Sequence, residues 1–235
     1  MFNKFKELFS SENLLDAAFK TTLTMLEFDH QMYDASRRTL RDTDTDELPF
    51  DVRKTDRRIN KYEREVRRQV LTHLTIAGTQ NLVPGLALVS IVIDVERIGD
   101  YTKNIVGLAT KHKRKLHGGA NEAPLQEIEK VNDEIFSKVI EVLKTQDEHK
   151  GREVMDLEQE TAERAESIIT DMILEKDASL GTADAVCLCL YARYLKRINA
   201  HLTNIASSIV NPFPRIGFRE KKKSYGTRRS TKNDQ

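Results

Sequence analysis

"IVIDVERIGDYTKNI", residues 91–105, is the stretch that decides how this chain folds. Its apolar residues recur at alternating steps of three and four, the spacing of a helix that packs one face against its neighbours. "YARYLKRINAHLTNI", residues 191–205, repeats these steps one hundred residues later. The two apolar seams are Leu88, Ile91, Val95, Ile98, Thr102, Ile105 and Ala109, and then Leu188, Tyr191, Leu195, Ile198, Leu202, Ile205 and Ile209.

The two stretches share more than their seams. Four aligned pairs are identical: Arg97/Arg197, Ile98/Ile198, Asn104/Asn204 and Ile105/Ile205. So few identities are weak alone, but the shared spacing and the same order of three helices in each half indicate an internal duplication.

The sequence therefore predicts an all-α fold of two tandem antiparallel three-helix bundles with a pseudo-twofold repeat. Short connections favour antiparallel neighbours, and two third helices packed lengthwise make an elongated molecule. We expect the first bundle to span residues 1–118 and the second 119–210, followed by a basic, flexible tail over 211–235. Start and stop signals place the helices at 12–42, 51–77, 83–116, 122–148, 152–176 and 181–210.

Composition narrows the class of protein. The chain is 39% hydrophobic and 32% charged, with ten Gly and five Pro in 235 residues, which favours a soluble helical protein. The longest apolar run, 82–95, is shorter than the ~20 residues of a membrane span. Eight Lys/Arg and two Asp/Glu give residues 211–235 a net charge of +6, so the rest carries 1 − 6 = −5. An acidic body argues against nucleic-acid binding, and Cys187 and Cys189 are expected to be reduced cytoplasmic thiols.

Acidic and amide side chains interrupt the apolar stretch. If the seam faces the core, Glu96 and Asp100 lie one turn apart on the opposite, outward face, and Asn104 extends that face. Like charges at this spacing cost about 0.2–0.5 kcal/mol. A neighbouring Lys or Arg, solvent or a metal ion should offset them, and a solvated acidic face is the commonest explanation. Gly99, which costs about 1 kcal/mol in mid-helix, indicates close approach by a backbone or ligand.

Three stretches resemble the helices of one known family. "DVERIGDYTKNIVGLA" (94–109) resembles the signature helix of PhoU, the phosphate-uptake regulator, whose pattern is E/D-x-E-R-I-G-D-x-x-x-N-I. "YARYLKRINAHLTNIASSIV" (191–210) resembles the second copy of that helix, and "DVRKTDRRINKYEREVRRQVL" (51–71) resembles the helix before the first copy. The resemblance extends over nearly the whole chain to Val210.

The resemblance implies a non-enzymatic, adaptor-like regulator of inorganic phosphate uptake and phosphate-dependent signalling. Such a protein would dock on a phosphate transporter component, a sensor histidine kinase or both. It would be cytoplasmic or peripheral at the inner face of the membrane, and a homodimer is an expected state. The alternative is a metal-binding or metal-storing helical bundle without a phosphate role.

The resemblance also implies a surface metal site, because the family's E/D-x-x-x-D motif can hold metal ions. The expected ion is divalent or trivalent, such as iron, zinc or magnesium. The implied ligands are Glu96, Asp100, Asp94, Asn104 and, from the preceding helix, Asp56. The second copy reads "KRINA" (196–200) where the family has Glu-Arg-Ile-Gly-Asp. Metal is therefore expected in the first bundle only.

Two weaker patterns remain. Glu27-x-x-His30 matches the spacing of di-iron bundles, but no second Glu-x-x-His step exists in the chain, so His30 is expected at the surface or core edge. The tail is expected to be solvated or to contact anionic lipid or an acidic partner. Its candidate contact residues are Lys221, Lys222, Lys223, Arg228 and Arg229.

Overall fold

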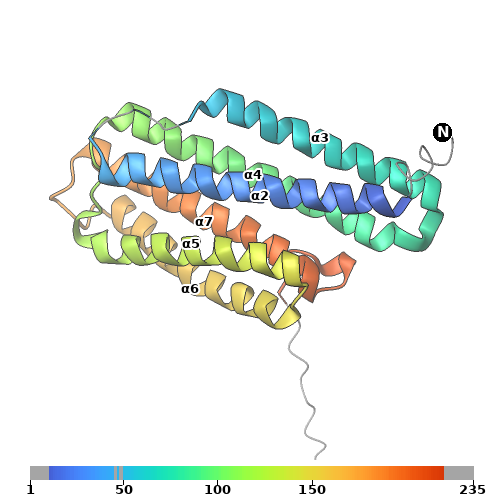
Figure 1. Cartoon of the computed structure of the whole chain (residues 1–235). Coiled ribbons are helices and arrows are strands. Elements are labelled where there is room, and N and C mark those ends of the chain that lie inside the picture. The colour runs from blue at the N-terminus through green and yellow to red at the C-terminus, as the bar shows by residue number, and fades with distance from the viewer. Residues whose placement is uncertain (1–10, 45–46, 48–49, 220–235) are drawn as a thin grey trace, which may run out of the picture.

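The computed structural model describes residues 11–44, 47 and 50–219, and six long helices make up most of this part of the chain (Figure 1). They are α2 (Ser11–Asp42), α3 (Val52–Ala77), α4 (Leu82–His112), α5 (Glu122–Thr145), α6 (Glu148–Ile173) and α7 (Thr182–Val210). Short 3₁₀ turns are η1 (Gly78–Asn81), η2 (Gly119–Asn121) and η3 (Phe213–Arg215). The all-α prediction is confirmed.

Capping residues explain where the helices begin and end. The Asp51 carboxylate accepts a backbone N–H bond of 2.9 Å from the first turn of α3. Asp147 accepts two such bonds, so α6 begins at Glu148 and not at the predicted residue 152. The predicted extension of α4 to residue 116 is also wrong. The helix ends at His112 because Lys113 adopts a left-handed conformation (φ 51°).

The helices form two three-helix units that lie side by side. In the first unit α2 and α4 pack together under α3, and in the second α5 and α7 pack against α6. The units meet where α4 packs along α7 and α2 along α5. These four helices form the centre, and α3 and α6 cover opposite sides of an elongated body (Figure 1). The predicted lengthwise packing of the two third helices is confirmed.

Both units bury their residues in the same register. On α3 and, 95 residues later, on α6, the shared buried positions are Ile59, Val66, Val70 and His73, and Val154, Thr161, Ala165 and Ile168. On α2 and, 103 residues later, on α5, they include Met25, Met32, Tyr33 and Leu40, and Ile128, Ile135, Phe136 and Leu143. The predicted seams of α4 and α7 are buried apart from Ile209, which is partly buried. The duplication therefore extends to all three helices of each unit.

A buried ion pair joins the two units. The Arg41 side chain on α2 is only 6% exposed and donates to Glu129 (2.9 Å) and Glu122 (2.5 Å) of α5, and also to the Leu116 carbonyl. The Tyr191 hydroxyl of α7 donates to the same Glu129 carboxylate (2.7 Å). Since these charges are satisfied across the contact between units, removing one partner would leave the other buried and unpaired.

The first unit also exposes an apolar stretch. Within Val52–His112, an 18-residue window has a mean hydropathy of 1.7, and 22% of that window is buried. By length and composition alone this stretch is apolar enough to cross a membrane, but core helices of soluble proteins can be equally long and apolar. The segment contains α3 and α4, which are joined through η1 and pack against each other (Figure 1).

Candidate functional site

Glu96 and Asp100 lie along the edge of α4 beside α3. Their side chains are 19% and 31% exposed, less than a fully outward face predicts. Asp56 of α3 lies close by, and Lys103 bridges the two helices. Its Nζ is 2.7 Å from Asp100 Oδ1 and 2.5 Å from Asp56 Oδ1. The structure thus brings Asp56 and Asp100 together around an ammonium group.

Two cations of α4 offset the acidic charge of this edge. Arg97 lies 3.4 Å from Asp100 and 3.8 Å from Glu96. Burial and the neighbouring Asp100 charge raise the pKa of Glu96. Burial acts to lower the pKa of Lys103, but its hydrogen bonds to the two aspartates outweigh burial and raise that pKa. The acids are therefore balanced by side chains of their own helix.

A third carboxylate lies beneath this edge, and the sequence analysis missed it. Asp29 of α2 is fully buried, and neither of its oxygens has a hydrogen-bond partner among the described residues. Burial, then the charges of Glu96 and Asp100, raise the pKa of Asp29 well above its ordinary value. A Cβ at Gly99 would lie 2.9 Å from Asp29 Oδ1, so the close approach inferred at Gly99 is made by this carboxyl and not by a backbone or ligand. The sequence did contain a sign of this burial, because Asp29 occupies a core position in the 3/4 apolar repeat of α2.

These acids have the chemistry of a cation site without its geometry. Carboxylate oxygens suit hard cations, and the unpaired oxygens of buried Asp29 are further donors. Among the described residues, however, no group of three or more His, Cys, Asp or Glu is placed to hold a metal ion. A metal here would have to displace the Lys103 ammonium, whose side chain is 30% exposed and able to turn away.

Asp94 does not join this group, whereas Asn104 lies beside Asp100. Residues two apart on a helix point about 200° apart, so Asp94 faces α7 and not the Glu96 edge. There its Oδ1 lies 2.7 Å from His201 Nδ1 and accepts a 3.0 Å bond from Asn204. Asp94 therefore links the two units, and the structure does not bring it into the predicted ligand set. Asn104 is exposed and lines a shallow surface hollow together with Asp100 and Lys103.

The corresponding place in the second unit has lost its acids. Lys196 stands where α4 has Glu96, and its Nζ lies 2.6 Å from Glu166 of α6. Ala200 stands where α4 has Asp100. Lys196 thus bridges α7 and α6 as Lys103 bridges α4 and α3. Only the first unit, however, keeps a pair of carboxylates on its third helix.

The chain beyond α7 folds back along α7 near Ala200. The Gly217 backbone N–H donates to Ser207 Oγ (2.7 Å), and Asn211 Nδ2 donates to the Phe218 carbonyl (2.7 Å). Beneath these residues lies a small hollow lined in part by Ala200. The start of the predicted tail thus packs on the second unit, and its η3 turn also contacts α4 of the first unit. The candidate contact residues Lys221, Lys222, Lys223, Arg228 and Arg229 lie outside the described residues.

Glu27 and His30 serve the contact between units. Glu27 accepts a 2.7 Å bond from Lys144, and His30 Nε2 lies 2.7 Å from Asp133. The His30 ring also stacks on Phe136, with centroids 4.8 Å apart. All three partners belong to α5, so the two residues do not converge on a shared point as di-iron ligands would.

Comparisons with known proteins agree with the repeat. The model of the PhoU domain matches residues 22–109 and again 125–209. PhoU from Pseudomonas aeruginosa has a similar structure (TM-score 0.75, 18% identity, 85% of this chain and 96% of that chain). So does the phosphate transport system regulatory protein PhoU from Streptococcus pneumoniae (TM-score 0.74, 13% identity, 86% of this chain and 95% of that chain). At these identities the structural likeness shows the fold alone, and no curated protein matches the sequence. Because the domain model covers well over half of the chain in two copies, the chain belongs to the PhoU domain family.

Proposed function

We propose that this protein is a non-enzymatic regulator of inorganic phosphate uptake and phosphate-dependent signalling. The observation that carries the proposal is the double match to the PhoU domain. The similar fold of a phosphate transport system regulatory protein supports it. The protein would act as a cytoplasmic adaptor at the inner face of the membrane. Its partner would be a phosphate transporter component, a sensor histidine kinase or both, and it would work as a monomer or homodimer.

Deletion of the gene tests this function directly. We expect phosphate uptake to become misregulated in the deletion strain and to be restored by the intact chain. The tagged protein should also co-purify with a phosphate transporter component or a sensor kinase. Normal uptake and normal phosphate-dependent signalling in the deletion strain would refute the proposal.

We further propose that the α3–α4 edge of the first unit holds a divalent or trivalent metal ion. Glu96, Asp100 and Asp56 supply oxygen donors there, and buried Asp29 adds negative charge beneath them. The second unit lacks the acids that such a site needs. Bound metal would replace Lys103 as the bridge between α3 and α4.

Metal analysis of purified variants tests the site. Glu96→Ala and Asp100→Ala are expected to lower metal content. The matched control is Asp156→Ala with Glu160→Ala, an exposed acid pair at the same spacing on α6. Equal metal content in the site variants and the control would refute the proposed site. Metal binding without any phosphate phenotype in the deletion strain would favour a metal-storing bundle instead.

A further inference from the structure

The outward face of α3 carries a continuous set of cations. Between residues 53 and 68 every exposed side chain is Lys or Arg, while the three acids of this span are only partly exposed. The members of this basic face are Arg53, Lys54, Arg57, Arg58, Lys61, Arg64, Arg67 and Arg68. The net charge of the body concealed this face, because the sum over the chain says nothing of where the cations lie.

Most of these cations have no acidic partner within the described part of the chain. Arg67 pairs with Glu63 (2.7 Å), and the Arg58 guanidinium stacks on the Phe28 ring at 4.1 Å from its centroid. No ion pair joins the other six to a described carboxylate. Unpaired cations fixed on one rigid helix attract an anionic surface over about 10 Å at 0.1 M salt.

An apolar tip continues the basic face. Leu71 is 69% exposed and lies three residues after Arg68, on the same face of α3 as Arg64 and Arg68. Beyond it the chain turns through η1 into α4. The other exposed apolar residues of this tip are Ile76 (58%), Leu82 (40%), Val83 (58%) and Leu86 (37%). Cations followed by exposed aliphatic side chains match the headgroups and acyl boundary of a bilayer.

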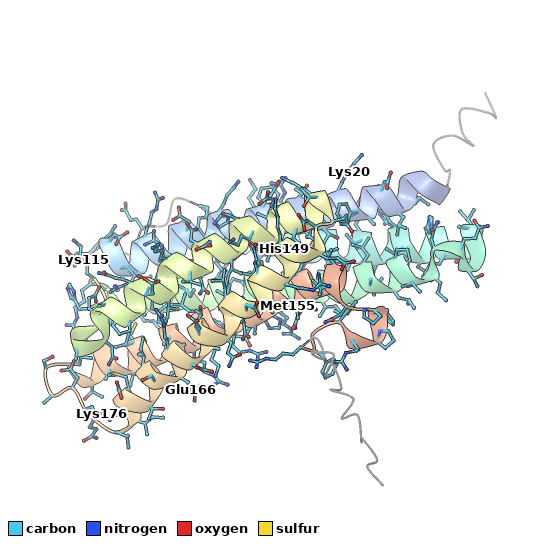
Figure 2. All side chains as sticks on the ribbon, turned by 90° about the horizontal axis from the view of Figure 1, so that it is seen from below. Lys20, Lys115, His149, Met155, Glu166 and Lys176 are labelled. Carbon is cyan, nitrogen blue, oxygen red and sulfur yellow. The ribbon has the colours of Figure 1, made fainter. Side chains whose placement is uncertain are left out.

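The opposite side of the molecule has the opposite charge. Asp156, Glu160, Glu163 and Glu166 are exposed on α6, with Arg164 as the one exposed Lys or Arg between residues 156 and 166. Figure 2 views the molecule from the α6 side, with Glu166 labelled on that helix. Because α3 and α6 cover opposite sides (Figure 1), an anionic surface would attract one side and repel the other. This polarity would orient the whole body.

We propose that the basic face and apolar tip of α3 dock this protein on a bilayer of anionic phospholipids. Nucleic acid would engage the cations but leave the aliphatic tip without a partner. A second copy offering its acidic α6 side would leave unpaired faces at both ends and so build an open chain of molecules. The docking surface does not depend on phosphate regulation, and its test is independent of uptake.

Co-sedimentation of the full chain with vesicles tests the proposal. Vesicles of phosphatidylcholine alone are compared with vesicles that also contain phosphatidylglycerol. The protein is expected to bind the anionic vesicles and to be released by salt, since the Debye length falls to about 3 Å at 1 M. Equal binding to both kinds of vesicle, or binding to neither, would overturn the proposal.

Charge reversal locates the surface. The combined variant Arg57→Glu, Arg64→Glu and Arg68→Glu is expected to bind anionic vesicles at least about a hundredfold more weakly, at roughly fivefold for each cation lost. Its control makes the same change in net charge at exposed cations of α2, α4 and α5: Lys20→Glu, Lys111→Glu and Lys130→Glu. The control should lose at most a few-fold. Equal loss in both variants would show general charge attraction and would overturn the assignment to α3.

Four further measurements complete the test. Circular dichroism and thermal unfolding check that each variant folds. Leu71→Ser with Ile76→Ser should weaken binding to the anionic vesicles at low salt, although it changes no charge. A DNA or RNA oligonucleotide that binds the protein more tightly than vesicles do would overturn the proposal. Sedimentation velocity tests whether the basic face instead binds a second copy of the chain. Salt-sensitive self-association that the α3 variant loses, while its vesicle binding is unchanged, would overturn the proposal.

Discussion

Replacing Gly99 by alanine tests the packing of the α3–α4 edge. Alanine is a better helix former than glycine by about 1 kcal/mol, so local propensity alone predicts a more stable protein. The new Cβ, however, would lie 2.9 Å from Asp29 Oδ1 and 3.2 Å from Ile59 Cδ1. Asp29 is fully buried, so either its carboxyl must turn within the packed core or its neighbours must shift. The same substitution at Gly107, on the same helix, meets nothing within 4 Å.

The two effects can be compared in size. Overpacking a filled core costs about 1–3 kcal/mol, so the net effect of Gly99→Ala ranges from about neutral to about 2 kcal/mol of lost stability. Gly107→Ala should gain about 1 kcal/mol. The two variants should therefore differ by about 1–3 kcal/mol, and Gly99→Ala should have the lower free energy of unfolding.

Urea and thermal unfolding followed by circular dichroism measure this difference. For a chain of this length each kcal/mol corresponds to about 2–4 °C in Tm. Adding Asp29→Ala should remove the clash, so a double-mutant cycle between residues 29 and 99 should show a coupling of about 1 kcal/mol or more. If Gly99→Ala proves as stabilising as Gly107→Ala, or if the coupling is absent, the packing argument is refuted.

Three more predictions concern buried and bridging charges. Asp29→Asn should raise stability near neutral pH by about 1–3 kcal/mol. The raised pKa of Asp29 makes the folded protein lose stability as pH rises above the ordinary aspartate value and through the folded pKa. Unfolding measured against pH should therefore show a smaller decline in the variant, and equal declines would contradict this. Arg41→Met should lower the free energy of unfolding by about 3–5 kcal/mol, because it leaves buried Glu129 without its cation. Adding Glu129→Gln should recover part of that stability in urea unfolding. If it recovers none, the unpaired carboxylate is not the cause. Lys103→Met removes the ammonium that competes with a metal, so it should strengthen divalent-cation binding about tenfold in calorimetry. The double variant Lys103→Met with Asp100→Asn should show no such gain.

Much of the fold follows from local patterns. The 3/4 seam at Leu88–Ala109 and its copy one hundred residues later predict helix type, the buried face and two similar units, because the helical period alone decides which residues share a face. Helix ends were predicted less well. They depend on single capping residues such as Asp147 and on the left-handed conformation of Lys113, which composition does not reveal.

The candidate site was predicted in part. The pairing of Asp56 with the Asp100 edge was inferred from the family resemblance, and the structure brings these two residues together. The third partner, Asp29, is far away in sequence and has no motif of its own. The helical wheel also predicted a more exposed Glu96, because the spacing of one helix contains no information about the neighbouring helix that covers its edge.

The sequence by itself determined that this protein is a duplicated helical bundle, and that only the first copy keeps an acid pair on its third helix. Tertiary structure decided how those acids are satisfied. Lys103 joins α4 to α3, Asp94 turns to α7, and Asp29 is buried under Gly99. The structure also decided that one outer helix is basic and the other acidic on the surface. Periodicity is a local property of the chain, but burial and charge pairing depend on which helices meet and on which face each one presents.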